Sequence, residues 1–191
     1  MNGTIKALIA VSLLTTMGQA LANDPVFSDG GELYVYGALR QNTCRMEMDS
    51  AWQDINLGDT AYADVNILGK TAKPVTVKIY LRDCPEIATR STNITPMTYT
   101  QSSQQPGYQA RFIAKADEAN PSLIKVVGAS GIGLRLKDVQ GKTVMLSRTG
   151  DTVLLNPGQN VVTYTLIPER TAAPLVAGPY HALIQFSMAY E

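Results

Sequence analysis

Histidine, cysteine and tryptophan, on which much enzyme chemistry and ligand binding depend, are scarce in this sequence. Its 191 residues contain one histidine, two cysteines and one tryptophan. A serine or cysteine hydrolase needs a base beside its nucleophile. His181, however, lies in an alternating apolar run, on the face opposite Ile184 and Phe186, where a solvent-facing strand residue is the simpler interpretation. We therefore predict no catalytic residue and no enzymatic activity.

The same scarcity argues against a metal or cofactor site. Cys44, Cys84 and His181 are far apart in the sequence and lack the spacing of zinc ligands. The stretch from Gly128 to Gly133 lacks the Gly-Lys-Ser/Thr of a phosphate loop and the third glycine of a dinucleotide fingerprint. It is better explained as a turn that leads into a strand. We predict no metal, no cofactor and no small-molecule substrate.

An excess of charge of one sign is missing as well. Lysine and arginine number 16, and aspartate and glutamate also number 16. A balanced chain has no strong field to attract nucleic acid or an anionic membrane. We therefore predict no nucleic-acid partner, and we expect partners to be bound through shape and backbone contacts.

Long apolar runs are absent, apart from a short one near the start. Lys6 precedes an apolar run from Ala7 to Met17, which is followed by Ala20-Leu21-Ala22. This order is typical of a signal peptide over residues 1–22. The run is shorter than the roughly 18 to 20 apolar residues that a transmembrane helix needs, and it lacks the polar face of a surface helix. We expect cleavage after Ala22, so that the mature chain begins at Asn23.

Export changes the expected chemistry of the two cysteines. An oxidising compartment favours a disulfide between Cys44 and Cys84 over two free thiols. Closing a loop of about 41 residues would stabilise the fold by roughly 4 kcal/mol at most in the chain-entropy model.

The remaining sequence predicts an all-β fold. Short β-branched and aromatic runs alternate with Gly, Pro, Asn and Asp, and no long stretch has a helical period. The expected strands are Leu33 to Leu39, Gln53 to Leu57, Val75 to Leu81, Gln109 to Ala114, Ile132 to Leu136, Thr152 to Leu155, Val161 to Ile167 and Tyr180 to Tyr190. This number and spacing of strands favours one β-sandwich domain. Trp52 is expected in the core, since a lone aromatic residue in an alternating strand is more often buried than a sugar-stacking platform.

The end of the sequence carries its most regular pattern. Ile184, Phe186, Met188 and Tyr190 alternate with more polar residues up to Glu191, and Gly178 is fourteenth from the end. A last core strand paired at both edges would also explain the pattern. The penultimate tyrosine and the glycine at that distance, however, resemble the chaperone-usher fimbrial pilin family of type 1 and P pili.

Other segments resemble motifs of that family and occur in the same order along the chain. Gly37 to Cys44 resembles the entry into the family's first strand, and Leu57-Gly58, Leu81 to Cys84, Ile132 to Asp138 and Tyr164-Thr165 follow in turn. The resemblance covers the whole mature chain.

The resemblance implies an incomplete immunoglobulin-like β-sandwich of six strands that lacks the seventh. An apolar groove would then remain beside the last strand, where unpaired edge amides and apolar surface favour aggregation. In this family a periplasmic chaperone supplies a strand until the next subunit's extension replaces it. The residues expected at this surface are Gly178, Ile184, Phe186, Met188 and Tyr190, with the terminal carboxylate of Glu191.

The same resemblance implies a donor segment at the start of the mature chain. Leu33, Val35, Gly37 and Leu39 alternate within an extension predicted over residues 23–42, and a pilin domain follows over residues 43–191. A glycine in the middle of the series permits close approach to a groove. An edge strand of the sandwich itself is the alternative. The implied partners are the chaperone, an outer-membrane usher and neighbouring pilins, with export through the periplasm to the surface fimbrium of a Gram-negative bacterium.

The position within a pilus is left open by the sequence. Met48 to Gln53, followed by Leu57 to Thr60, resembles the minor subunit that terminates and anchors P-type pili. The extension has the ordinary length of a shaft pilin, so a major shaft subunit is an alternative. A self-sufficient secreted binding module with a complete sandwich is another.

Overall fold

The computed structural model describes residues 31–38, 43–93 and 98–191. The chain divides into two units, Met1–Leu39 and Arg40–Glu191, which are described separately here. The predicted signal peptide and Leu39 lie outside the described residues. No helix in the described ranges is long and apolar enough to cross a bilayer.

The described part of the first unit has no regular secondary structure. Residues 31–38 form neither helix nor strand, so the strand expected from Leu33 is not formed over this part. The side chains of Leu33, Tyr34, Val35 and Tyr36 are all exposed. An extended segment by itself gains no ladder hydrogen bonds, which explains why alternation alone does not produce a strand here.

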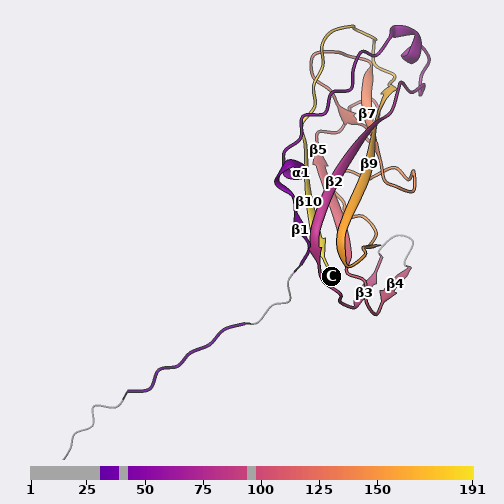
Figure 1. The fold of residues 1–191 in the computed structure, drawn as a ribbon. Coiled ribbons are helices and arrows are strands. Elements are labelled where there is room, and N and C mark those ends of the chain that lie inside the picture. The colour runs from indigo at the N-terminus through magenta and orange to yellow at the C-terminus, as the bar shows by residue number, and fades with distance from the viewer. Residues whose placement is uncertain (1–30, 39–42, 94–97) are drawn as a thin grey trace, which may run out of the picture. The chain divides into compact units, whose positions relative to one another are not determined.

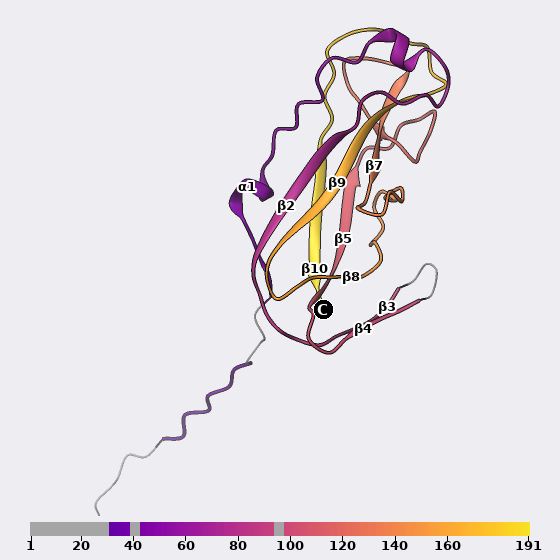
Figure 2. The same ribbon diagram turned by 45° about the vertical axis from the view of Figure 1, so that its right-hand side comes forward.

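The regular secondary structure of the second unit consists almost entirely of antiparallel strands (Figures 1 and 2). Its elements are β1 (Arg45–Met46), α1 (Met48–Ala51), the 3-10 helix η1 (Tyr62–Val65), β2 (Val75–Cys84), β3 (Thr89–Thr92), β4 (Tyr99–Ser102), β5 (Gly107–Ala114), β6 (Ile124–Lys125), β7 (Ile132–Lys137), β8 (Val153–Leu154), β9 (Gly158–Arg170) and β10 (Ile184–Tyr190). They form a five-stranded sheet in the order β1-β2-β9-β7-β6, a three-stranded sheet in the order β10-β5-β8, and the hairpin β3-β4.

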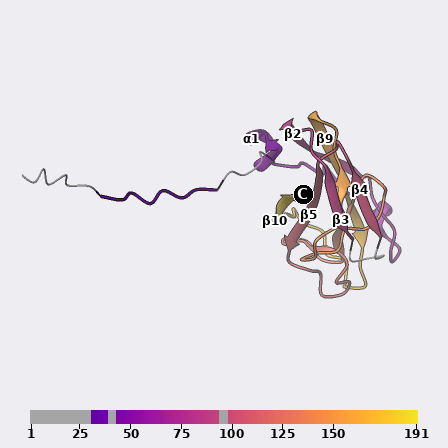
Figure 3. The same cartoon turned by 90° about the horizontal axis from the view of Figure 1, so that it is seen from below.

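The core lies between the two larger sheets, which the view from below shows as layers (Figure 3). The ring of Phe112 on β5 meets Tyr164 of the opposite sheet edge-on at 4.7 Å between centroids. It also stacks on Phe186 of β10 at 6.0 Å. Ile79 and Leu81 of β2 are almost fully buried, whereas Lys78 and Tyr80 face outward, as their alternation predicts. The all-β prediction is therefore confirmed.

The disulfide between Cys44 and Cys84 is present, as predicted. It joins the residue before β1 to the last residue of β2. Both cysteines are buried within the core cluster.

The segment after β1 differs from the prediction. No strand forms over residues 53–57; instead α1 follows β1 directly. The Ser50 hydroxyl accepts a hydrogen bond from the Tyr80 amide at 2.8 Å, and the Gln53 side chain donates to the Lys78 carbonyl at 3.0 Å. Side chains thus replace backbone pairing along this edge of β2. As a result Trp52 is 90% exposed, so its predicted place in the core is wrong.

The last strand is shorter than predicted. It begins at Ile184, whereas the sequence pattern suggested Tyr180. His181 is exposed, as expected, but its backbone forms an isolated bridge with Val127. Nearby, a Cβ on Gly178 would lie 2.6 Å from the Gly128 carbonyl oxygen. This lead-in is therefore held by the turn at residues 127–130 and does not pair with β5.

Candidate functional site: the strand-accepting edge of β10

β10 combines a half-buried apolar face with an exposed face made of Gln185, Ser187 and Ala189. Its exposure alternates along all seven residues. The half-buried residues that pack against the core are Ile184, Phe186, Met188 and Tyr190. They are four of the residues predicted for the partner surface, and one strand brings them together.

Only one edge of β10 is used by the sheet. The strand pairs with β5 from Ile184 opposite Ala114 to Tyr190 opposite Tyr108. Beyond it, Glu191 and Gly107 exchange two backbone hydrogen bonds of 3.0 and 3.1 Å. Hydrogen-bonded and non-hydrogen-bonded pairs alternate along an antiparallel ladder. Because Glu191 is at a hydrogen-bonded position, every second residue before it, beginning with Tyr190, is at a non-hydrogen-bonded position. The backbone N–H and C=O groups of these four half-buried residues therefore point away from β5.

We call this outward-pointing backbone, carried by Ile184, Phe186, Met188 and Tyr190, the strand-accepting edge. β10 is last in its sheet order, and no strand of the described residues pairs with it on this side. β5 contrasts with it, because its other side is paired. The amides of Ser147 and Gly150 donate to the carbonyls of Phe112 and Ala110 at 2.7 and 2.8 Å. The sandwich is thus open at β10 and not at β5.

The side chains at the strand-accepting edge are also incompletely enclosed. Tyr190 is only partly buried as a residue, yet its hydroxyl is shielded from water and has no hydrogen-bond partner among the described residues. Burial raises the pKa of this phenol. A buried hydroxyl without a partner costs free energy, as does a half-exposed phenylalanine. An added strand would reduce the exposure of these side chains.

A side-chain bridge marks the end of this region at which β10 begins. The hydroxyl oxygens of Thr60 and Tyr180 are 3.1 Å apart. Thr60 follows the segment that carries Ile55 and Leu57, which pack on the same core as β10. The bridge therefore links the lead-in of β10 to a second stretch of chain that packs on the same core.

The remaining predicted site residues lie elsewhere. Glu191 continues the β10 ladder, whereas Gly178 lies outside β10 against Gly128. Leu33, Val35 and Gly37 belong to the other unit, and a Cβ on Gly37 would meet nothing within 4 Å. Neither the Thr60–Tyr180 bridge nor α1 was found from the sequence. No local pattern pairs residues that are 120 positions apart.

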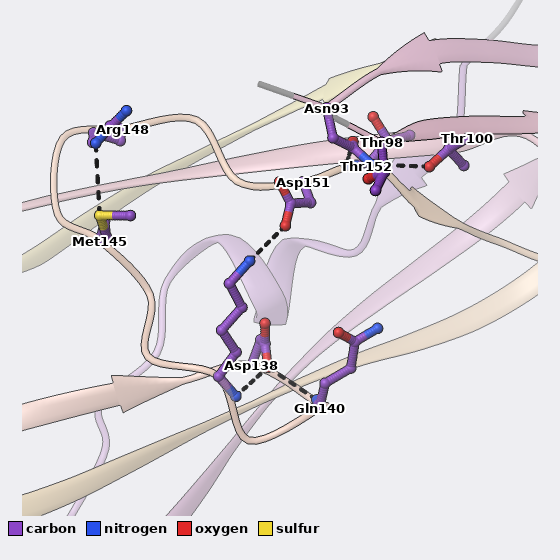
Figure 4. Close-up of polar contacts among 10 residues, drawn as sticks. Asn93, Thr98, Thr100, Asp138, Gln140, Met145, Arg148, Asp151 and Thr152 are labelled. Carbon is purple, nitrogen blue, oxygen red and sulfur yellow. Dashed lines mark hydrogen bonds and ion pairs between the residues drawn. The ribbon is translucent and has the colours of Figure 1, made fainter. Parts of the chain in front are cut away.

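A cleft of about 600 Å³, lined by polar and apolar side chains, lies on the other side of β5. Figure 4 shows polar contacts among residues in and near it. Within it, Lys142 forms an ion pair with Asp151 at 2.6 Å. The Asp138 carboxylate accepts hydrogen bonds from the amides of Gln140 and Lys142 at 3.0 and 2.9 Å.

On the same side, Asn93 accepts a hydrogen bond from the Thr152 amide at 2.7 Å and donates to the hydroxyls of Thr98 and Thr100, both at 3.1 Å. These polar groups therefore satisfy one another and tie the β3-β4 hairpin to the segment before β8. The described residues contain no group of three or more His, Cys, Asp or Glu placed to hold a metal ion.

Comparison with known proteins relates the chain to fimbrial proteins. A family model described as "Fimbrial protein" matches residues 33–191. "Fimbrial subunit type 1" of Salmonella typhimurium is 28% identical over 193 residues, covering 94% of this chain and 94% of that protein. "PAP fimbrial minor pilin protein" of Escherichia coli is 26% identical over 161 residues, covering 84% of this chain and 77% of that protein.

Solved structures of pilins share the fold. The P pilus rod subunit PapA matches with a TM-score of 0.62 at 19% identity, covering 78% of this chain and 100% of that chain. A chain from a chaperone-usher pilus structure matches with a TM-score of 0.61 at 18% identity, covering 87% and 99%. The predicted immunoglobulin-like β-sandwich is therefore confirmed, and the unpaired side of β10 is consistent with an incomplete one.

Proposed function

The chain belongs to the fimbrial protein family, a family of structural, non-enzymatic subunits, and from this premise we propose that it is a subunit of a chaperone-usher pilus assembled by donor-strand exchange. The strand-accepting edge of β10 is the observation that carries the proposal. Strand addition joins proteins through backbone hydrogen bonds, while alternate side chains fix the register. Over its seven residues, β10 has both an unpaired backbone edge and side chains that alternate between two faces.

The extension supplies the complementary part. Leu33, Val35, Gly37 and Leu39 alternate, and so present four positions to match the four half-buried residues of β10. In this proposal the extension of one subunit lies along the strand-accepting edge of another. Until then a periplasmic chaperone covers the edge, and an outer-membrane usher receives the complex. The signal peptide over residues 1–22 directs export, the extension covers residues 23–42, and the pilin domain covers residues 43–191.

A pair of substitutions on one strand tests this function. Phe186→Asp places a charge on the half-buried face, where an ion is strongly disfavoured. Ser187→Asp places the same charge on the exposed face of the same strand. With the chaperone of the same pilus system co-expressed, we expect Phe186→Asp to abolish co-purification of the two proteins. We expect Ser187→Asp to leave it unchanged.

Expression of the mature chain alone separates this proposal from a self-sufficient secreted binding module. An open sheet edge with half-exposed apolar residues favours aggregation, so we expect the chain to be insoluble without a chaperone or donor peptide. A stable, soluble monomer would show that the sandwich needs no added strand. It would support the binding module and refute the pilus-subunit function.

Within the pilus, we propose that the subunit is a minor one that terminates and anchors the fibre. The likeness to the PAP minor pilin and the segments Met48 to Gln53 and Leu57 to Thr60 support this position. The likeness to the Salmonella type 1 subunit favours the alternative, a major shaft pilin. Deletion of the gene distinguishes the two. Loss of a terminator should give longer and easily shed pili, whereas loss of the shaft pilin should remove the fibre.

A further inference from the structure

We propose that an incoming extension is also bound on the outer face of the sheet, where its Tyr36 lies across Ser187 of β10 and stacks on the guanidinium of Arg111 on β5. This inference rests on the proposed function, and it names residues that select the partner strand. The partner is the extension of a neighbouring subunit that has apolar residues on its inward face and an aromatic ring at the centre of its outward face.

The extension carries large apolar residues on both of its faces. Leu33 and Val35 belong to the inward series of the proposed strand, and Tyr34 and Tyr36 alternate with them. All four side chains are between 79% and 88% exposed. A strand covered on one face alternates between apolar and polar residues, whereas a strand covered on both faces has a nearly continuous apolar run. The run therefore indicates that the two tyrosines also gain a covering surface when the extension is added.

The proposed pairing determines which residue of β10 lies beside Tyr36. Residues 33–39 of the extension and residues 184–190 of β10 are both seven-residue stretches that begin and end on an inward position. When the four inward residues of each are matched, the central residues Tyr36 and Ser187 lie beside each other, whichever way the added strand runs. Every strand pair in the described residues is antiparallel. In an antiparallel ladder Tyr36 and Ser187 would form a non-hydrogen-bonded pair, the kind in which side chains are closest.

Ser187 is small enough for a ring to cross over it to the next strand. Arg111 of β5 is directly opposite Ser187 in the ladder, and both residues are exposed. Directly opposite residues place their side chains on the same face of a sheet. The added strand and β5 would lie about 10 Å apart, which is two strand spacings. The long side chains of Tyr36 and Arg111 can meet across this distance because Ser187 between them is short.

The guanidinium of Arg111 is available for such a contact. Arg111 takes part in none of the ion pairs of the described residues. A guanidinium within about 6 Å of the centre of a tyrosine ring is attracted to the face of that ring. The β3-β4 hairpin already contains a contact of this kind, in which Arg90 lies 5.8 Å from the centre of the Tyr99 ring.

The experiment is a competition between two peptides for the chaperone-bound mature subunit. Both peptides span residues 32–42, one with the wild-type sequence and one with Tyr36→Leu, which stays apolar but has no aromatic face. Native mass spectrometry measures the ratio of the two subunit–peptide complexes. We expect about a threefold excess of the complex with the wild-type peptide. A Tyr36→Phe peptide should compete equally with the wild-type peptide, because it keeps the ring.

Variants of the subunit locate the contact. With Arg111→Gln we expect most of the preference for the wild-type peptide over the Tyr36→Leu peptide to be lost, because the two substitutions remove the same interaction. Lys78→Gln is the matched control, since it removes one positive charge from an exposed position of the other sheet. That variant should keep the full preference.

A second measurement needs no variant of the subunit. The Nε–H proton resonance of Arg111 should shift upfield when the wild-type or Tyr36→Phe peptide is bound, because the proton then lies over an aromatic ring. It should not shift in this way with the Tyr36→Leu peptide. The same position of this resonance in all three complexes would overturn the inference.

The outcomes separate this inference from the proposed function. Equal binding of the wild-type and Tyr36→Leu peptides would overturn the inference and leave the pilus function standing, and it would point to a third subunit as the cover of the tyrosines. A preference that is equally strong with Arg111→Gln would also overturn it, since the ring would then be recognised elsewhere. Failure of every peptide to displace the chaperone would instead count against donor-strand exchange, and the inference would fail with it.

Discussion

At the scale of single residues, a buried ion pair offers the clearest test of the sheet. Arg135 on β7 and Glu169 on β9 form a bidentate pair, with Nη2 of Arg135 donating to Oε1 of Glu169 at 2.6 Å. Their side chains are only 18% and 8% exposed. The hydrogen bond with Glu169 raises the pKa of the Arg135 guanidinium, which therefore stays charged.

We expect Glu169→Gln to destabilise the subunit by about 3 kcal/mol, because it leaves the buried Arg135 charge without its counter-ion. The measurement is the urea midpoint of the chaperone-bound subunit at fixed concentration. Glu118→Gln removes a pair with Lys125 in which the Glu118 side chain is 79% exposed. That control should not change the midpoint measurably. Equal effects of the two substitutions would contradict a structural role for the buried pair.

The burial predicted for Trp52 from its local sequence pattern was wrong. Its expected burial assumed a strand, in which alternate residues face the core. The chain instead turns through α1, where the polar Ser50 is 1% exposed and lies against β2 while Trp52 faces solvent. The hydrogen bonds that favour this turn connect to residues about thirty positions away, beyond any local period.

At the scale of elements, α1 completes the edge of β2 without being a strand. The Ser50 hydroxyl is the acceptor for the Tyr80 amide. We expect Ser50→Ala to increase hydrogen exchange at this amide by about tenfold, because loss of the acceptor leaves a backbone donor unpaired. Asp49→Ala, on the exposed side of the same turn, is the control and should leave the Tyr80 amide unchanged. Unchanged exchange in Ser50→Ala would show that another group pairs with the amide.

β10 illustrates which properties of an element its sequence reveals. The alternation of Ile184, Phe186, Met188 and Tyr190 was predictable, because side chains of a strand alternate whatever its neighbours are. Its starting residue was not, because His181 pairs with Val127 and so diverts the chain before Ile184. The bridge of Tyr180 to Thr60 was equally inaccessible. Both depend on contacts between distant parts of the sequence.

At the scale of the whole molecule, the class of fold followed from composition and periodicity. Strand runs separated by turn residues predicted a sandwich, and β2, β5, β7 and β9 formed near the expected positions. The disulfide also followed, since only two cysteines are present. The assignment of strands to sheets did not follow, because it depends on which faces and edges meet.

Removal of the disulfide tests its contribution to the entire domain. Cys44 and Cys84 are separated by 40 positions. For a loop of this size the chain-entropy model gives a stabilisation of about 4 kcal/mol. We expect Cys44→Ser/Cys84→Ser to lower the stability of the chaperone-bound subunit by at most about that amount and to reduce its yield. The yield of complex from periplasmic extracts and the urea midpoint are the measurements. An unchanged midpoint would mean that the bridge constrains the unfolded chain little.

The position of the disulfide also determines how a pilus subunit would carry mechanical load. Tension transmitted through the extension would enter the domain at Cys44. Without the covalent bond it would act first on β1, which has only two residues. The bond passes the pull directly to Cys84 at the end of β2. β2 runs antiparallel beside β9, with Val75 to Leu81 in continuous register. The pull is therefore passed to a strand that is held by a row of backbone hydrogen bonds, and not only to a strand of two residues.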